Sequence, residues 1–424
     1  METLLRKLKM IVQDVSLRRR VLFVFVALVI FRLLANIPIP AAAGQNLGAL
    51  LANDQALGFL NILTGGGLSS VSIVMLGVGP YITASIIFQL LTMMSPKIKA
   101  MQTEEGEIGR RKMTQYSRLL TVPLALVQGY GLLAYLSQQG ILVGLTPFEI
   151  FTNTIIVAAG SILLMWIGEL ISEFGIGNGV SLIIFAGIVS SIPATVGQLI
   201  FTFDVSQVPI FVAAIIATIL LIVAVVYMTE AERPVPITYA KQVRSGGRST
   251  GGSSTYLPLR LNQAGVIPII FALSILTIPT IVANALSTVS NGAVQTVALF
   301  VQKFLTNGWI HGALYFLFVF VFTFFYTAVT FDPEAISNNL QKNGAFIPGI
   351  RPGASTAEYL SKILTRITLV GAVFLGLVAV LPLVMQNLTK IASLSIGGTA
   401  LLIIVSVVLD LVKKIDAQIT MREY

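Results

Sequence analysis

Residue types that carry redox and metal chemistry are nearly missing from this chain. Its 424 residues include no cysteine and a single histidine, His311. The absence of cysteine excludes disulfide bonds and thiolate metal sites, and one histidine cannot form a histidine-based metal cluster. We therefore expect no metal and no cofactor.

Charge is also scarce. Only 11% of the residues are charged, whereas 55% are hydrophobic, which is more apolar surface than a soluble globular domain needs. A helix needs about 20 mostly apolar residues to cross a bilayer. The sequence therefore predicts an all-α polytopic membrane protein with ten transmembrane helices. These expected spans, a few of them short, are Val21–Ile37, Val71–Met94, Leu119–Leu136, Ile150–Ile171, Gly179–Ile192, Val208–Met228, Gly265–Leu286, Trp309–Phe331, Ile367–Met385 and Ile391–Leu411.

The basic residues are distributed unevenly around these spans. If the spans alternate from a cytoplasmic N-terminus, Arg32, Lys303 and Lys390 are the only three of the 27 Lys and Arg residues that fall outside the inner side. Translocated loops avoid Lys and Arg, so we expect both termini in the cytoplasm. The basic N-terminus leads into a segment without a small-residue cleavage site, so the first helix is expected to remain as a span.

Two of the expected inner loops, 229–264 and 332–366, are long. The first contains "AKQVRSGGRSTGGSSTYLPLR", in which glycine and serine predict a flexible tip and the basic residues form a cationic surface. Ordinary positive-inside bias explains most of this charge. Docking to an anionic partner, such as ribosomal RNA or an acidic protein face, is the functional alternative.

Ionisable residues are almost absent from the middle of the spans. Glu169 and Asp410 lie near expected inner ends, His311 lies near an outer end, and Arg32 lies deepest. An ion-coupled transporter needs ionisable groups within its spans, and a hydrolase needs a nucleophile with an adjacent base or paired carboxylates. An enzyme is therefore not expected, and a secondary transporter of small solutes remains only as an alternative.

A short apolar stretch, "GFLNILTGGGLSSVS" (58–72), precedes the second expected span. Its glycines, Gly65 to Gly67, interrupt the helical pattern before a bilayer could be crossed. Other glycine- and proline-rich clusters, such as "LGVGPYITAS" (76–85) and "GIGNGVS" (175–181), fit tight helix packing as well as hinges.

Five blocks of sequence resemble the SecY family, the central pore subunit of the bacterial Sec protein translocase. The blocks occur in order over essentially the whole chain. They are "GGGLSSVSIVMLGVGPYITASIIFQLL" (65–91), "EEGEIGRRKMTQYSR" (104–118), "MWIGELISEFGIGNGVSLIIFAGIV" (165–189), "YLPLRLNQAGVIPIIFA" (256–272) and "FFYTAVTFDPEAISNNLQKNGAFIPGIRPG" (324–353).

The resemblance implies a protein-conducting channel in the bacterial cytoplasmic membrane. Such a channel passes unfolded secretory polypeptides across the membrane and releases transmembrane segments laterally into lipid. The chain contains no nucleotide-binding motif, so energy would come from a partner. The implied partners are a SecE-like clamp subunit, a SecG-like accessory subunit, the SecA motor ATPase, the ribosome, signal sequences and nascent chains, and membrane lipids.

The resemblance also implies a clamshell of two pseudo-symmetric five-helix halves. Residues 1–195 would form the N-terminal half, with spans 1–5 and a re-entrant plug helix near 57–68. Residues 196–424 would form the C-terminal half, with spans 6–10 and the cytosolic loops 229–264 and 332–366. A surface-lying amphipathic turn is the alternative for the plug stretch. The plug residues would be Phe59, Leu60, Asn61, Ile62, Leu63, Gly65, Gly66 and Gly67.

Three further groups of residues match functional positions of the family. An aliphatic ring at the pore constriction would dewet when empty and so block ions. It would consist of Val78, Ile82, Ile184, Ile270 and Ile403. The lateral gate, between spans 2 and 3 and spans 7 and 8, would include Thr83, Gln128 and Ile278, the last standing where some relatives carry a polar residue. Docking of cytosolic partners would involve Lys241, Arg244, Arg248 and Arg351.

Overall fold

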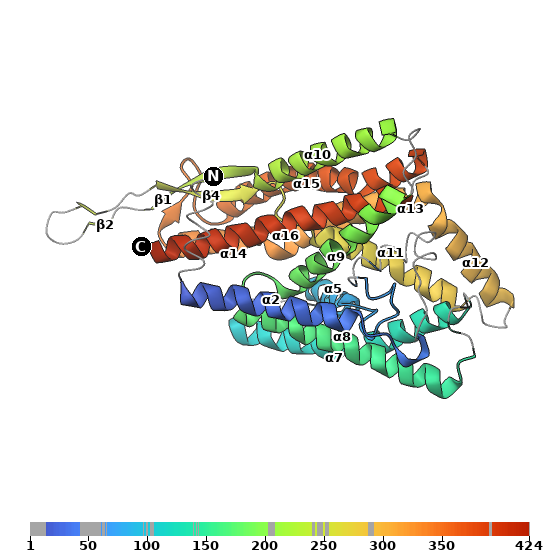
Figure 1. Cartoon of the computed structure of the whole chain (residues 1–424). Helices are drawn as coiled ribbons and strands as arrows, with labels where there is room; N and C mark the ends of the chain where they lie inside the picture. Colours follow the sequence, from blue (N-terminus) through green and yellow to red (C-terminus); the bar gives the residue numbers. More distant parts are fainter. Residues whose placement is uncertain are drawn as a thin grey trace.

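A computed structural model of the chain is mostly helical (Figure 1). It describes residues 14–42, 61, 64, 66–95, 97–98, 101, 106–138, 140, 142, 144–201, 208–239, 242–243, 249–250, 254–286, 292–389 and 392–423. Within these ranges, each of the ten expected apolar segments coincides with a helix, although the second begins later than expected. The length and apolar character of the segments therefore predicted the positions of the long helices.

The long helices form two groups in chain order. The first group is α2 (Val15–Ala35), α5 (Gly79–Met94), α7 (Gly106–Gln138), α8 (Pro147–Phe174) and α9 (Gly179–Phe201). The second group is α10 (Val208–Glu230), α11 (Ile267–Leu286), α13 (Gly308–Thr330), α15 (Ala354–Thr389) and α16 (Ala392–Glu423). Shorter elements are η1 (Pro40–Ala42), α12 (Gly292–Thr306) and α14 (Pro333–Lys342).

The two groups form two sides of the molecule. Figure 1 shows α2, α7 and α8 on one side and α10, α15 and α16 on the other, with α9 and α11 between them. The main contacts between the groups join α11 to α5 and α7, and α9 to α16. Because α9 continues through Pro193 to Phe201, the division between halves expected at 195/196 falls inside this helix.

Four of the described helical stretches are long and apolar enough to cross a membrane by length and composition alone. They are Arg111–Ser137, Pro147–Phe174, Gly308–Lys342 and Ala354–Met385. Shorter apolar helices occur at Gly179–Pro193, Ile215–Glu230 and Ile267–Leu276. Many large apolar side chains on the outside of the bundle, such as Leu220 at 63% exposure, face away from the protein, as expected where lipid is the solvent.

The second expected span, Val71–Met94, does not start as a helix. Residues 66–78 form a series of turns, and α5 begins only at Gly79. Two features explain the late start: Gly77 has a φ of 58°, and Pro80 occupies the first turn of α5, where a missing N–H costs no helical hydrogen bond. We call residues 66–78 the re-entrant segment.

The described parts of the two long loops contain strands, so the all-α prediction was wrong for this part of the chain. Loop 229–264 contains an antiparallel pair, β1 (Glu232–Tyr239) and β4 (Ser254–Arg260), and the short strands β2 (Gln242–Val243) and β3 (Ser249–Thr250). Loop 332–366 contributes β5 (Ala345–Phe346), which completes a sheet of order β4-β1-β5. Val235 and Leu259 of the sheet pack with Leu360 of α15 in one buried cluster.

One further helix was not predicted. The stretch between the seventh and eighth expected spans was interpreted as a loop, but it contains α12, which contacts α11 and α13. In Figure 1, α12 lies at the end of the bundle opposite the strands.

Candidate functional site

All five residues of the expected aliphatic ring are buried in the structure. All of them belong to a single cluster of buried apolar side chains. Their exposed fractions are 1% for Val78, 8% for Ile82, 1% for Ile184, 6% for Ile270 and 1% for Ile403. Such a cluster offers no polar partner to water or ions.

The ring residues come from both helix groups. Val78 is the N-cap of α5, and its carbonyl accepts a hydrogen bond from the N–H of Ile82 at 3.0 Å, so these two side chains lie one turn apart. Ile184 lies in α9, whereas Ile270 and Ile403 lie in α11 and α16. A relative movement of the two groups would therefore change the distances between the ring residues.

A cavity of about 300 Å³ lies next to the ring. Val266, Leu182 and Val407 line it, and each is within about one helical turn of a ring residue on the same segment. The cavity is also lined by the first residues of α9, the end of α13 and the Lys413–Lys414 pair of α16. It extends to Arg260 at the end of β4. We call this cavity the vestibule.

Two polar side chains of the vestibule were not singled out from the sequence. Asn262 and Ser406 are each 8% exposed, and neither Asn262 Oδ1 nor Ser406 Oγ makes a hydrogen bond within the described part of the chain. Buried polar atoms of this kind normally find a partner, and in a cavity this partner is water or a bound chain. A lone Asn or Ser gives no signal in a sequence, because its environment depends on the fold.

The re-entrant segment is held by the end of α2. Residues Pro38 and Ser72 form an antiparallel bridge, in which the N–H of Ile39 donates to Val71 O at 2.9 Å and the N–H of Ile73 donates to Ile37 O at 3.0 Å. Val71 has a φ of 45°, which is unusual for a β-branched residue. The surrounding contacts therefore hold the segment in a strained conformation.

Helix α8 supports the same segment from the other side. Ser161 Oγ is fully buried and donates to Gly77 O at 2.8 Å. Gly160 lies so close that a Cβ atom at this position would overlap the carbonyl oxygen of Ile73. A glycine and a serine in an apolar helix read as generic packing residues, so this role was not predicted.

Most of the predicted plug lies outside the described residues. This applies to Phe59, Leu60, Ile62, Leu63 and Gly65, whereas Asn61, Gly66 and Gly67 are described. Asn61 Oδ1 accepts from the N–H of Ser69 at 2.8 Å, and Asn61 O accepts from the N–H of Gly66 at 2.8 Å.

The glycines of this turn meet distinct requirements. Gly66 has a φ of 82°, and a Cβ there would lie 3.5 Å from Arg32 Nη1, so the guanidinium lies beside this turn. Gly67 leaves no room for a side chain, because a Cβ would lie 2.8 Å from Ser72 Oγ.

The predicted gate residues lie on helices that are in contact. Thr83 is in α5, Gln128 is in α7, and Ile278 is in α11, which contacts both α5 and α7. Thr83 is 7% exposed, and its hydroxyl donates to Gly79 O of its own helix at 3.0 Å. This hydroxyl hydrogen is therefore used within α5 and does not bridge to a neighbouring helix.

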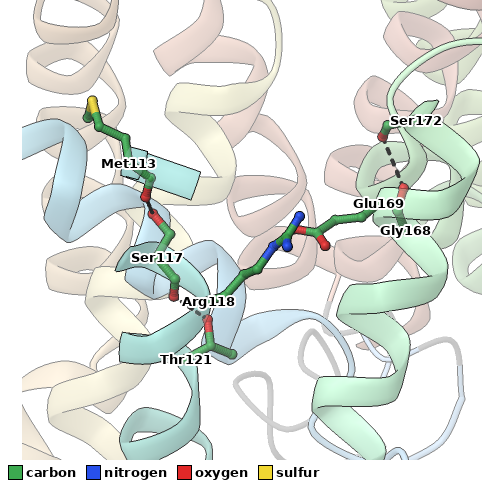
Figure 2. A network of polar contacts seen from close by, with 7 residues as sticks. All are labelled: Met113, Ser117, Arg118, Thr121, Gly168, Glu169 and Ser172. Carbon is green, nitrogen blue, oxygen red and sulfur yellow. Dashed lines mark hydrogen bonds and ion pairs between the residues drawn. The ribbon is translucent and has the colours of Figure 1, made fainter. Parts of the chain in front are cut away.

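An ion pair joins α7 to α8 (Figure 2). Arg118 Nε donates to Glu169 Oε1 at 2.7 Å, and the two side chains are 44% and 20% exposed. Beside it, Ser172 Oγ donates to Gly168 O at 3.0 Å and accepts from the N–H of Gly179 at 2.8 Å, which ties α8 to the start of α9. Glu169, the carboxylate on which coupled transport would depend, is thus engaged in a helix–helix contact.

Of the predicted docking residues, only Arg351 is described; Lys241, Arg244 and Arg248 lie outside the described residues. Arg351 is exposed between Gly349 and Gly353, which have φ values of 81° and 100°. Its carbonyl accepts from Thr356 Oγ1 at 3.0 Å. The turn therefore holds its backbone in place and leaves the guanidinium at the surface.

Comparisons with known proteins agree on one family. The SecY family model matches residues 72–412. The protein translocase subunit SecY of Streptomyces scabiei is 40% identical over 428 residues, which covers 96% of both chains.

Two solved structures share the fold. A SecY structure that concerns the plug domain and the closed state of the translocation channel matches with a TM-score of 0.66 at 20% identity, over 96% of this chain and 93% of that chain. Sec61 in the canine ribosome-channel complex from the endoplasmic reticulum matches with a TM-score of 0.65 at 20% identity, over the same shares. With its long apolar helices, the chain is a multi-pass membrane protein that belongs to the SecY family.

Proposed function

We propose that this chain is the pore subunit of a protein translocase and conducts unfolded polypeptides across a membrane. The observation that carries this proposal is that the five expected ring residues, from both helix groups, all lie in the main buried apolar cluster. Membership of the SecY family supports the same function.

The chemistry of the ring and the vestibule fits a polypeptide better than a small solute. Aliphatic side chains form no fixed polar contacts, so they can deform around any sequence, and an empty apolar constriction excludes ions by dewetting. Asn262 and Ser406 have buried oxygen atoms in the vestibule without a hydrogen-bond partner among the described residues, and the amides of an extended chain could hydrogen-bond to them. A site for one small solute would instead need several fixed polar groups around it.

The membrane topology in this proposal has ten spans in two halves. The ten long helices would alternate across the bilayer, with both termini and the strands in the cytoplasm, because the basic residues gather there. The hinge of the clamshell would lie between the fifth and sixth spans, that is, between α9 and α10. Inter-group contacts through α11 and through α9 and α16 fit two rigid halves that open on the α11 side.

The plug and the lateral gate can be placed in the same arrangement of two halves. The stretch near 57–68 would fill the funnel on the far side of the ring from the vestibule, with Gly66 and Gly67 as its connection to the re-entrant segment. The lateral gate would open between α11 and the pair α5 and α7. The Arg118–Glu169 ion pair supports this geometry, because it fastens α7 to α8 and so keeps α7 in the N-terminal half.

Cytosolic partners would dock on the surface formed by the two ordered loops. Arg351 is exposed on a turn that a hydrogen bond to its carbonyl holds in place. The two loops and α15 form a separate buried apolar cluster. We assign this surface to the motor ATPase and the ribosome. A SecE-like clamp subunit and a SecG-like subunit would complete the complex in the bacterial cytoplasmic membrane, in contact with membrane lipids, signal sequences and nascent chains.

Transport by reconstituted vesicles tests the function. The full chain is co-reconstituted with its clamp and accessory subunits, and a secretory precursor, the motor ATPase and ATP are added outside. We expect the precursor to become resistant to added protease, and to lose this resistance when detergent is added. Equal protection in vesicles that lack the chain would contradict the proposal.

A further inference from the structure

Helix α12 (Gly292–Thr306) crosses the end of the bundle opposite the strands (Figure 1). It runs at a steep angle to the long axis of the bundle, and it connects α11 to α13. In a membrane protein whose long helices cross the bilayer, a helix in this position lies roughly parallel to the membrane surface.

The side chains of α12 divide into three faces. A helix turns by about 100° per residue, so residues three and four apart share a face. One face packs on the bundle through Ala298, which is 3% exposed, and through Leu305, which packs against the main buried cluster. A second face carries only large apolar side chains: Val297, Phe300 and Phe304 are 64%, 70% and 43% exposed.

The third face carries the polar side chains of the helix, together with Leu299, which is 50% exposed. Gln295 and Lys303 are exposed there, and Lys303 is the one charged residue of α12, which contains no acidic residue. The order of the faces around the helix, with the protein on one side and the apolar and polar faces on the others, is that of a helix lying at an interface between lipid and water.

The residues directly after α12 also indicate a position at the interface between lipid and water. Asn307 caps α13, and Trp309 in its first turn is 67% exposed. Tryptophan is enriched where a span leaves the hydrocarbon region. The C-terminal end of α12, which carries Phe304, is therefore close to the first turn of α13 and to Trp309.

We propose that α12 binds the lipid surface at this end of the bundle, with Val297, Phe300 and Phe304 inserted among the acyl chains and Lys303 near the phosphate groups. The occupant is lipid rather than water, because water would leave three large apolar side chains exposed together. It is lipid rather than a protein partner, because α12 contacts α13, whose first turn exposes Trp309, a residue type enriched where spans leave the hydrocarbon region. This proposal goes beyond the channel function, and its test does not depend on transport.

Fluorescence quenching distinguishes the possible surroundings of this face. Trp166 and Trp309 are first replaced by phenylalanine, which leaves no tryptophan in the chain. Phe300→Trp then reports on the apolar face, and Gln295→Trp serves as the matched control on the polar face. Each variant of the full chain is reconstituted in phosphatidylethanolamine–phosphatidylglycerol vesicles, with brominated acyl chains as the lipid quencher or with iodide on both sides as the water-soluble quencher.

We expect tryptophan at position 300 to lose most of its emission to brominated lipid and little to iodide, and its emission maximum to be blue-shifted. Tryptophan at position 295 should show the opposite pattern. Quenching at position 300 by iodide alone would mean that the face is in water, and protection from both quenchers would mean that protein covers it. Either result would overturn the proposal.

Discussion

The contact between α8 and the re-entrant segment makes a strong prediction about the closed state. In Gly160→Ala, the new Cβ would overlap the carbonyl oxygen of Ile73 and lie 2.8 Å from its carbonyl carbon. Both atoms belong to the backbone, so no side-chain rotation can relieve the overlap. The segment must move away from α8, and the hydrogen bond from Ser161 Oγ to Gly77 O must lengthen.

The magnitude follows from comparison with a matched glycine. Overpacking a tight site costs about 1–3 kcal/mol. Gly129 in α7 faces the same segment, but its nearest neighbour is Leu76 Cδ1 at 3.6 Å, which is ordinary van der Waals contact. Gly129→Ala therefore also replaces a helix glycine by alanine, which favours the helix by about 1 kcal/mol, but it creates no overlap.

The consequence for the channel is a leak. If the strain is relieved when the segment leaves α8, a cost of about 1–3 kcal/mol shifts the closed–open equilibrium by roughly 5-fold to 150-fold. Halide efflux from vesicles that contain the full chain measures this shift. We expect faster efflux for Gly160→Ala and no change for Gly129→Ala. Equal efflux for the two variants would refute the reasoning that the contact between α8 and the re-entrant segment keeps the channel closed.

Three further predictions concern other parts of the structure. Ile403→Asn puts an amide into the buried ring, where an unpaired polar group costs about 1–3 kcal/mol, so halide efflux should rise. The control Val408→Asn, on the exposed face of α16, should leave efflux unchanged. Equal efflux for the two variants would exclude Ile403 from the seal. Removal of the Arg118–Glu169 pair, with each residue replaced by glutamine singly and together, should give a coupling energy below about 1 kcal/mol in thermal unfolding, because the pair is partly exposed. A loss of proton- or sodium-coupled uptake in the Glu169 variant would instead favour a transporter. Arg351→Glu should leave unfolding unchanged and slow motor-driven translocation by about tenfold, equivalent to about 1.4 kcal/mol of binding; an unchanged rate and unchanged motor affinity would remove Arg351 from the docking surface.

The long helices could be predicted because their signal is simple. About 20 apolar residues in a row leave few alternatives to a span, and every expected segment coincides with a helix in the described chain. The start of α5 was missed because apolar residues continue through 71–78. Hydrophobicity alone does not report that Gly77 has a positive φ and that Ser72 pairs with Pro38.

The strands of the two long loops were missed for a different reason. β1 contains Pro234 and Pro236, and proline normally argues against a strand. In the structure, β5 pairs only with Thr238 and Tyr239, so β1 is an edge strand at both prolines, and a missing N–H is tolerated there.

The aliphatic ring could not be derived from composition or periodicity. Aliphatic residues fill every span, so Ile184 and Ile403 look like any other packing residues, and only the family resemblance singled them out. Their meeting in one cluster depends on how two helix groups fold against each other. The support from Gly160 and Ser161 was missed for the same reason.

The most direct test of the central claim is photocrosslinking during transport. A photoreactive amino acid is placed at Ile82 or Ile184 of the ring, and at Leu220 as a lipid-facing control that is 63% exposed. A secretory chain is then stalled in transit through the reconstituted complex. The account predicts crosslinks to the stalled chain from both ring positions and none from position 220. A stalled chain that never crosslinks to the ring, in vesicles that still protect it from protease, would contradict the assignment of this ring as the conducting path.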